Sequence, residues 1–148
     1  MLAMLAYAAF LPTVPGVPNP AVTQSNIGQT ICNPVKQANG KTWVHNQRPP
    51  VAYTNKIKFA LMDKAGIPRS KSALYELDHK LSIEDGGSPT DPNNLWLQPY
   101  FGDWNAHIKD VLETRLNKLV CTGKITLAED QHELMTDWIA AYKLRIKP

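Results

Sequence analysis

Cysteine is scarce in this chain. Cys32 and Cys121 are the only two among 148 residues, and neither belongs to a CxxC pair. A zinc ribbon, or any other site built from several thiolates, is therefore excluded. The two cysteines are compatible with free thiols in the core or with one disulfide that closes a loop of about 90 residues. A disulfide would imply an oxidising compartment, and the sequence leaves both alternatives open.

The chain also lacks a strong excess of charge of either sign. Its 16 Lys and Arg residues against 13 Asp and Glu residues give a net charge of +3. This mildly basic balance fits a polyanionic partner, but solvated helix surfaces explain it equally well. The sequence contains no zinc finger or helix-turn-helix pattern. Any nucleic-acid binding would therefore rest on backbone contacts, with little sequence specificity.

The apolar run at the N-terminus is short. MLAMLAYAAFL (1–11) falls well below the ~20 residues of a membrane-spanning helix. It has the length of the apolar part of a signal peptide, although no Lys or Arg precedes it; the alternative is an apolar helix packed on the domain. Residues 12–20 (PTVPGVPNP) hold four prolines, which predicts an extended linker. We expect residues 1–20 to be a leader-like segment with its linker. The mature protein would be secreted or periplasmic and free of the membrane, with the cytoplasm as the alternative.

Periodic segments begin after an irregular region at residues 21–50. Thr54 can cap a helix over 55–65, and Gly66, followed closely by a proline, ends it.

The second half of the chain has the order strand, turn, strand, helix, helix. Asp103 is a good N-cap for the first of these helices, and Thr126 with Glu129 forms a capping box for the last one. The predicted elements are a strand-like segment 74–83 (LYELDHKLSI), a turn 84–94 (EDGGSPTDPNN), a strand 95–99 (LWLQP), a helix 104–119 and a helix 127–144. They predict one α+β domain over residues 21–148.

Residues suited to catalysis occur within these elements. Asp78 and His79 are adjacent in the first strand, so their side chains point to opposite faces unless the strand bends. Such a pair suits a metal ligand and a general base on two sides of a substrate phosphate. His79 titrates near neutrality and could take a proton from an attacking water. Asn94, at the start of the second strand, could hold the imidazole in one tautomer.

The phase of the helix over 104–119 selects a second metal ligand. At roughly 100° per residue, Asn105 lies at the end of the apolar stripe, whereas His107 falls on the opposite face. A buried asparagine needs a partner, and a cation shared with Asp78 would supply one. This oxygen pair suits Mg²⁺, with Mn²⁺ or another divalent ion as the alternative. The stripe consists of Ile108, Leu112, Leu116 and Leu119.

Each of these residues also has a simpler interpretation. An Asp-His pair is commonly part of a surface turn or an ion pair. Asn94 follows turn residues and suits their backbone conformation, Asn105 could be a polar residue at a helix start, and Lys80 a strand charge. Their order and spacing together nevertheless favour a common site.

Residues 75–142 resemble the HNH (His-Me finger) nuclease superfamily, in a cysteine-poor subgroup of small, often exported enzymes. The motifs that carry the resemblance are ELDHKL, GG, NLW, NAHIKD, VCTG and a last helix containing DQ and W. The upstream stretches NPAVTQSNIGQTIC and W…RPP…YT are similar to the N-terminal segment of such proteins. The resemblance implies a ββα-metal core over about residues 74–120 with flanking helices, and cleavage of DNA or RNA with one divalent ion.

Carried over residue by residue, the resemblance implies a role for five side chains. Asp78 and Asn105 would bind the ion, His79 would be the base with Asn94 orienting it, and Lys109 would contact nucleic-acid phosphate. We expect Lys80, next to His79, to be a further phosphate contact.

The chain departs from the family pattern at a few positions. Ser82 and Leu97 stand where the family has proline, and Asp130 replaces the alanine before Gln131. Asn105 stands where histidine is frequent, which should favour Mg²⁺ over softer transition metals. None of these changes removes a proposed catalytic group.

The leading hypothesis is a monomeric, metal-dependent endonuclease that hydrolyses phosphodiester bonds in DNA, with RNA as the alternative substrate. A rival hypothesis is a nucleic-acid-binding module whose nuclease site has decayed. A third is an interaction or toxin-type domain that targets a protein.

Overall fold

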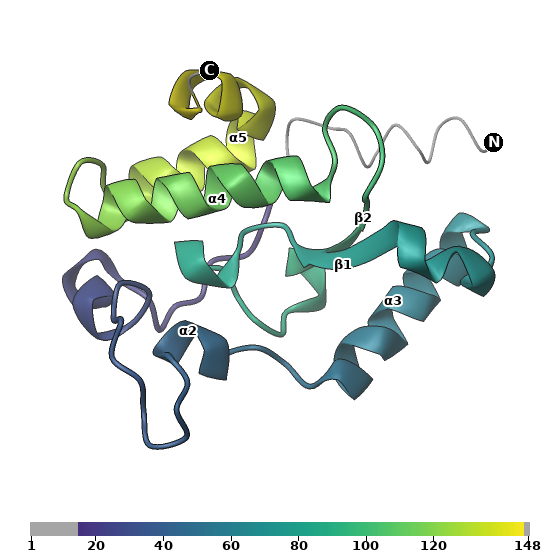
Figure 1. Cartoon of the computed structure of the whole chain (residues 1–148), viewed down its shortest axis with the longest axis horizontal. Helices are drawn as coiled ribbons and strands as arrows, with labels where there is room; N and C mark the ends of the chain where they lie inside the picture. The colour runs from purple at the N-terminus through teal and green to yellow at the C-terminus, as the bar shows by residue number, and fades with distance from the viewer. Residues whose placement is uncertain (1–14, 147–148) are drawn as a thin grey trace.

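A small antiparallel sheet lies between helices in this protein. The structure is a computed structural model that describes residues 15–146 (Figure 1). The apolar segment 1–11 lies outside the described residues. Within them, the sheet has two strands and all other regular elements are helical, which confirms the predicted α+β class. Figure 1 shows α4 (Ala106–Cys121) and α5 (Leu127–Arg145) on one side of the sheet and α3 (Val51–Ala65) on the other.

The two strands pair in a simple register. β1 (Tyr75–His79) runs antiparallel to β2 (Leu95–Pro99), with Asp78 opposite Trp96. The second strand has the predicted bounds, but the first ends four residues before the predicted end at residue 83. It ends because Ser82 caps a 3-10 turn, η3 (Ile83–Asp85), by accepting a hydrogen bond from the backbone N–H of Asp85. The apolar character of Leu81 and Ile83 reflects burial in the core rather than a continuing strand.

The helix before the sheet is longer than the sequence predicts. α3 begins at Val51, directly after Pro50, and not at residue 55. Proline suits the start of a helix because its missing N–H would have had no partner there. Gly66 ends the helix as predicted, with the positive φ of 70° that glycine adopts without strain. The Lys58 ammonium donates to the carbonyls of Ser72 and Tyr75, which docks α3 on the start of β1.

Of the two helices after the sheet, one starts later than predicted and the other is kinked. α4 is capped by Asn105, not by Asp103: Asn105 has extended backbone angles, and its side chain accepts from the N–H of Ile108. α5 opens with the predicted capping box of Thr126 and Glu129. Asp137 leaves the helical conformation and its carboxylate accepts from the N–H of Ala140, so α5 restarts there after a kink.

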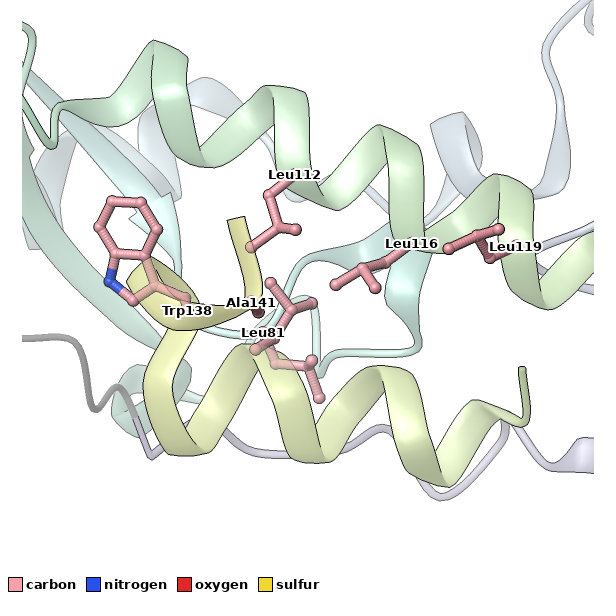
Figure 2. Close-up of a cluster of buried hydrophobic side chains, with 7 residues drawn as sticks. Leu81, Leu112, Leu116, Leu119, Trp138 and Ala141 are labelled. Atoms are coloured by element: carbon pink, nitrogen blue, oxygen red, sulfur yellow. The ribbon is translucent and has the colours of Figure 1, made fainter. Parts of the chain in front are cut away.

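The main hydrophobic core fills the space between α4 and α5. Figure 2 shows Leu81, from the loop after β1, inserted between the two helices. The predicted stripe of α4 is buried against it at Leu112, Leu116 and Leu119, with Ile108 partly buried, which confirms the phase of this helix. The core residues are Leu81, Leu112, Leu116, Leu119, Leu134, Trp138 and Ala141.

A second cluster and a disulfide attach the N-terminal segment to the helices. Val22 and Ile31 pack against Val120 and Leu127. Beside them, Cys32 and Cys121 form a disulfide with a Cα–Cα distance of 5.4 Å. The structure thus selects the disulfide over free thiols.

Residues 15–20 contain no helix, and they do not form a free linker. Pro18 forms a bridge with Gly87, and the N–H of Val17 donates to the Asn94 side chain. This part of the predicted linker is therefore bound to the loop between the strands. No helix in the described part of the chain has both the length and the apolar character needed to cross a bilayer.

Two carboxyl groups lie buried against each other where η3 meets α5. Asp85 and Asp130 are fully buried. One Asp85 oxygen accepts from the Ser82 hydroxyl at 2.5 Å. The other oxygen of Asp85 and both oxygens of Asp130 have no hydrogen-bond donor among the described residues. Two ionised carboxylates would repel each other here. If Asp85 and Asp130 share one proton, an O–H···O hydrogen bond replaces the repulsion.

The pKa values of this pair support proton sharing. Burial, and then the neighbouring Asp130 carboxylate, raise the pKa of Asp85 well above its ordinary value. Burial raises the pKa of Asp130 to about 7, with Asp85 opposing the shift and Glu133 and Glu84 adding to it. The negative charges of Glu84 and Glu113 add to the raised pKa of Asp85. Between the unfolded pKa near 4 and about 7, the folded chain therefore binds more protons than the unfolded chain.

Removing the disulfide should cost much of the stability. Replacing both Cys32 and Cys121 by serine is expected to lower the free energy of unfolding by about 2–5 kcal/mol, because the unfolded chain gains the freedom of a long open loop. Urea unfolding under non-reducing conditions measures the loss. Reductant should destabilise the wild type but not the double variant; equal sensitivity of both would contradict the structure.

The carboxyl pair should make stability decrease as pH rises. Because the folded pKa of Asp130 is raised, its favourable protonated state is lost as pH climbs through about 7. Asp130→Asn should therefore be more stable than the wild type at pH 8, by about 1–3 kcal/mol, and this gain should shrink towards pH 5. Thermal unfolding at both pH values tests this, with the exposed Asp103→Asn as the matched control. A gain that does not depend on pH would rule out proton sharing.

Candidate active site

One face of the sheet is polar and lies against α4. Side chains alternate along a strand, so Glu76 and Asp78 of β1 share a face, together with Gln98 opposite Glu76 on β2. Asp78 and Gln98 are buried. Polar groups occupy a position where a two-layer domain normally places apolar side chains, which marks this face as a functional candidate.

A buried lysine connects this face to α4. Lys109 is completely buried, and its ammonium donates to Asp78 Oδ2 at 3.2 Å and to the His79 carbonyl at 3.0 Å. The third partner is the Glu113 carboxylate, one helical turn further along α4. All three N–H groups of the ammonium therefore have acceptors in the protein.

The charge state of this cluster follows from burial and its neighbours. Burial alone would lower the pKa of Lys109, but the carboxylates of Asp78 and Glu113 raise it above its ordinary value, so the side chain stays an ammonium. Burial raises the pKa of Glu113, against the opposing effect of Lys109. The cluster holds Asp78 in place, with its other oxygen accepting from the His79 N–H at 2.8 Å.

The structure does not place Lys109 where a substrate phosphate could reach it. The sequence predicts a phosphate contact, but the ammonium is enclosed in the protein with three acceptors. The reason lies in the phase of α4: Lys109 follows Asn105 by four residues and so falls near the apolar stripe, at about 40° on the helical wheel. Lys80, the other predicted phosphate contact, is partly exposed just after β1.

His79 is fixed in one orientation by the turn between the strands. Its Nε2 lies 2.9 Å from the carbonyl oxygen of Pro89. A carbonyl only accepts, so Nε2 carries the proton and Nδ1 keeps the free lone pair. Burial lowers the pKa of His79, with the Pro89 hydrogen bond and Asp78 opposing the shift. The ring is therefore neutral at neutral pH and basic at Nδ1.

Asn94 organises the loop rather than the imidazole. Its side-chain oxygen accepts from the N–H groups of Val17 and Leu81, each at 3.0 Å. Its side-chain nitrogen donates to the carbonyls of Leu81 and Ser88. The sequence predicts contact with His79, yet these bonds to backbone use the whole amide, and Pro89 takes the orienting role. Asn94 still acts on the site indirectly, because it closes the loop that carries Pro89.

The two glycines of the GG motif are needed by the same loop. Gly86 has a φ of 81°, which favours glycine. A Cβ at Gly87 would lie 1.8 Å from the carbonyl oxygen of Leu81, so no side chain fits there. The motif thus has a steric origin in the closure of the loop.

The side chains of Asn105 and His107 make no hydrogen bond to the group formed by Asp78, Lys109 and Glu113 in the described part of the chain. Both ends of the Asn105 amide are used locally: the oxygen accepts from the Ile108 N–H and the nitrogen donates to the Gly102 carbonyl. This geometry therefore does not support the prediction that Asn105 shares an ion with Asp78. His107 is exposed, as predicted, and stacks on Tyr100 with ring centroids 4.8 Å apart.

A pocket of about 330 Å³ opens beside Asp78 and His79. Five carboxyl groups line it, and Arg48 is the one Lys or Arg among the lining residues. The acidic residues are Glu76, Asp78, Glu84, Asp110 and Glu113.

Burial and the neighbouring negative charges raise the pKa values of the carboxyl groups in this pocket. Burial, then Asp78 and Asp110, raise the pKa of Glu76 to about 7. Burial, then Asp78, raise the pKa of Asp110, and burial raises that of Glu84. Groups that repel one another in this way gain from a nearby cation.

The donor chemistry of the pocket suits a hydrated divalent cation. Carboxylate oxygens are the ligands Mg²⁺ prefers, and it commonly takes one or two of them with water and phosphate completing its shell. The buried Gln98 amide oxygen, on the same face as Glu76 and Asp78, has no hydrogen-bond partner within residues 15–146. In that part of the chain no three Asp, Glu, His or Cys side chains converge closely enough to form a ready-made cage. The pocket therefore fits a loosely held, largely hydrated ion better than a tightly enclosed one.

Comparison with known proteins returned no similarity. The chain matches no protein-family model, no curated protein and no solved structure.

The site also contains residues that the sequence did not reveal. Asp110 directly follows Lys109, and Glu113 follows Lys109 by four residues. On the helical wheel Glu113 lies at about 80° from Asn105, near the apolar stripe of α4. Arg48 is about thirty residues before β1, and only the fold brings it to the pocket. Helical phase could have indicated Glu113, whereas no local pattern indicates Arg48.

Lys109 should act as a structural residue. Lys109→Met removes the ammonium and leaves Asp78 and Glu113 buried without a counter-charge, which should lower the free energy of unfolding by about 3–5 kcal/mol. The matched control is Lys118→Met, an exposed lysine on the same helix, with an expected change below about 1 kcal/mol. Urea unfolding at pH 7 compares the two. Unchanged stability combined with weaker nucleic-acid binding would favour a phosphate contact instead.

Proposed function

We propose that this chain is a metal-dependent endonuclease that hydrolyses phosphodiester bonds in DNA, with RNA as the alternative substrate. The observation that carries the proposal is His79, a neutral imidazole with a fixed tautomer beside Asp78 at an acidic pocket. A general base poised near neutrality next to oxygen ligands is the combination that metal-assisted hydrolysis uses.

In the proposed reaction His79 acts as the base. Its Nδ1 accepts a proton from a water as that water attacks the phosphorus atom, and the Pro89 carbonyl stabilises the positive charge that develops on the ring through Nε2–H. The bond from phosphorus to the leaving oxygen breaks, and that oxygen takes a proton from solvent. Asp78, together with either Glu76 or Asp110, would hold a divalent ion, which when bound would polarise the phosphate and offset charge on the leaving oxygen.

The order of elements supports the finer assignment of the fold. β1, the loop closed by Asn94, β2 and α4 follow one another over residues 75–121, with the Asp-His pair at the end of β1. This order and placement agree with a ββα-metal core of the HNH superfamily, and that assignment is part of the proposal. Asn105 is left out of the proposed ligand set because its amide caps α4.

One observation favours the rival hypothesis of a decayed site. Both oxygens of Asp78 already have protein donors, Lys109 and the His79 N–H. An ion would therefore have to share Asp78 with Lys109 or displace it. A module of this kind would bind nucleic acid in a salt-dependent way without cleaving it.

The disulfide supports the proposal that the protein works outside the reducing cytoplasm. We therefore propose that the protein acts after secretion or in the periplasm.

The base should be essential for cleavage. His79→Ala is expected to lower the rate of plasmid nicking in Mg²⁺ or Mn²⁺ by about 10²–10⁴-fold, because the attacking water loses its proton acceptor. His107→Ala, which removes the exposed histidine of α4, is the matched control and should retain activity. EDTA should abolish cleavage by the wild type. Full activity of His79→Ala would refute the mechanism, and wild-type binding without cleavage in any divalent metal would establish the decayed module.

A further inference from the structure

We propose that Arg48 binds the phosphate of the substrate at the pocket beside His79. This inference rests on the proposed nuclease function and assigns its phosphate contact to a residue outside the ββα segment. Arg48 is exposed and lines the same pocket as Asp78 and His79.

Arg48 is suited to this role because its guanidinium group is available to bind an anion. No ion pair or side-chain hydrogen bond involves Arg48 within residues 15–146. The nearby lysines differ in this respect. Lys109 is buried with three acceptors, and Lys58 is bonded to two backbone carbonyls. Among the residues that line the pocket, Arg48 is thus the cationic group available to an anion.

Arg48 acts electrostatically on the groups that would do the chemistry. Its charge lowers the pKa of His79, behind the larger effect of burial, and it opposes the raised pKa values of Glu84 and Asp110. Arg48 also lines the pocket together with His79, Glu84 and Asp110.

The segment that carries Arg48 is held in place at both ends. On one side, the Arg48 N–H donates to the His45 carbonyl at the end of α2 (Trp43–Asn46). On the other side come Pro49 and Pro50, and a residue before proline is restricted to extended conformations. The Arg48 side chain is therefore presented from a stiff backbone.

A second anchor connects this segment to the loop that orients the base. The Tyr53 hydroxyl, in the first turn of α3, donates to the Thr90 carbonyl at 2.5 Å. Thr90 directly follows Pro89, whose carbonyl holds His79. The Arg48 segment and the imidazole are thus fixed to the same short loop, which gives a constant geometry between a phosphate-binding group and the base.

The chemistry of the pocket explains why arginine is needed. The carboxyl groups of the pocket that stay ionised repel a phosphodiester, so a bound substrate requires compensating cations. A divalent ion, when bound, would supply part of this charge. A guanidinium supplies the rest and can donate two parallel hydrogen bonds to phosphate oxygens, which an ammonium cannot do with the same geometry.

A different role for Arg48 must be distinguished by the experiment. Arg48 could serve merely as a counter-charge for Glu84 and Asp110, without touching substrate. In that case its removal would change the pH profile of cleavage and the pKa of His79, but it would leave substrate affinity and its salt dependence unchanged.

The test combines binding and cleavage on folded variants. Arg48→Ala, Arg48→Lys and Arg48→Gln are compared with the wild type, with the exposed Lys41→Ala from the same segment as the matched control. Fluorescence anisotropy with a short DNA duplex in the His79→Ala background, over a range of salt concentrations, measures binding without cleavage. Plasmid nicking in the wild-type background gives KM and kcat, and thermal unfolding confirms that each variant is folded.

We expect Arg48→Ala to weaken binding about 10–100-fold, as for the loss of a charge-assisted hydrogen bond. The slope of log affinity against log salt should become shallower by the amount that corresponds to about one phosphate contact. Arg48→Lys should recover the salt slope but only part of the affinity, Arg48→Gln should recover neither, and Lys41→Ala should behave as the wild type.

Two results would overturn the assignment. Wild-type affinity and KM in Arg48→Ala, while His79→Ala abolishes nicking, would exclude Arg48 and leave the nuclease proposal intact. A changed pH profile with unchanged KM and salt slope would show the counter-charge role instead. If the wild type neither binds nor cleaves nucleic acid, the nuclease proposal fails and the phosphate contact fails with it.

Discussion

The buried ammonium of Lys109 determines how the sheet meets the helix in this protein. A lysine without solvent access must find acceptors for all its protons, and here they come from two different elements. Asp78 and the His79 carbonyl belong to β1, whereas Glu113 belongs to α4. The position of β1 along α4 is therefore fixed by charge as well as by packing. Since the same bonds hold Asp78 and the backbone of His79, the structural constraint and the candidate site cannot be separated.

Packing and polar bonds cooperate around this point. Leu81, two residues after His79, enters the core between α4 and α5, and Asn94 holds the backbone of Leu81 at both its N–H and its carbonyl. A shift of the loop would therefore cost a hydrophobic contact and several hydrogen bonds together. This explains how a sheet of only two strands can present His79 in one orientation.

Sequence patterns predicted the regular elements well where periodicity and caps agreed. The capping box at Thr126, the end of α3 at Gly66 and the strand at 95–99 are confirmed. The start of α4 was missed because Asp103 and Asn105 are both good caps, and only the fold decides between them. The helical phase does not apply to Asn105, because this residue has extended backbone angles and does not belong to the helix.

The candidate site was predictable only in part, for reasons that are physical. The position of Asp78 and His79 in a strand could be read from the sequence, but hydrogen-bond partners could not. Asn94 satisfies backbone groups that are distant in sequence, and its partners appear only after the loop has folded. Lys109 illustrates a different difficulty, because a charged residue near an apolar stripe is normally assumed to reach solvent. Its burial becomes understandable once Asp78 is known to face it.

The dependence of the pocket on the N-terminal segment follows from the same reasoning. Residues 15–47 contain one short α-helix and one 3-10 helix, and their buried apolar residues, Val22 and Ile31, pack in a small cluster with Val120 and Leu127. A segment with so little buried area would be weakly attached on its own. The disulfide between Cys32 and Cys121 fixes its middle to α4, and Tyr53 fixes the chain beyond Arg48 to the loop at Thr90. Arg48 thus lies on the chain between two attachments, the disulfide to α4 and the hydrogen bond to the loop between the strands, and neither involves a residue of β1 or β2.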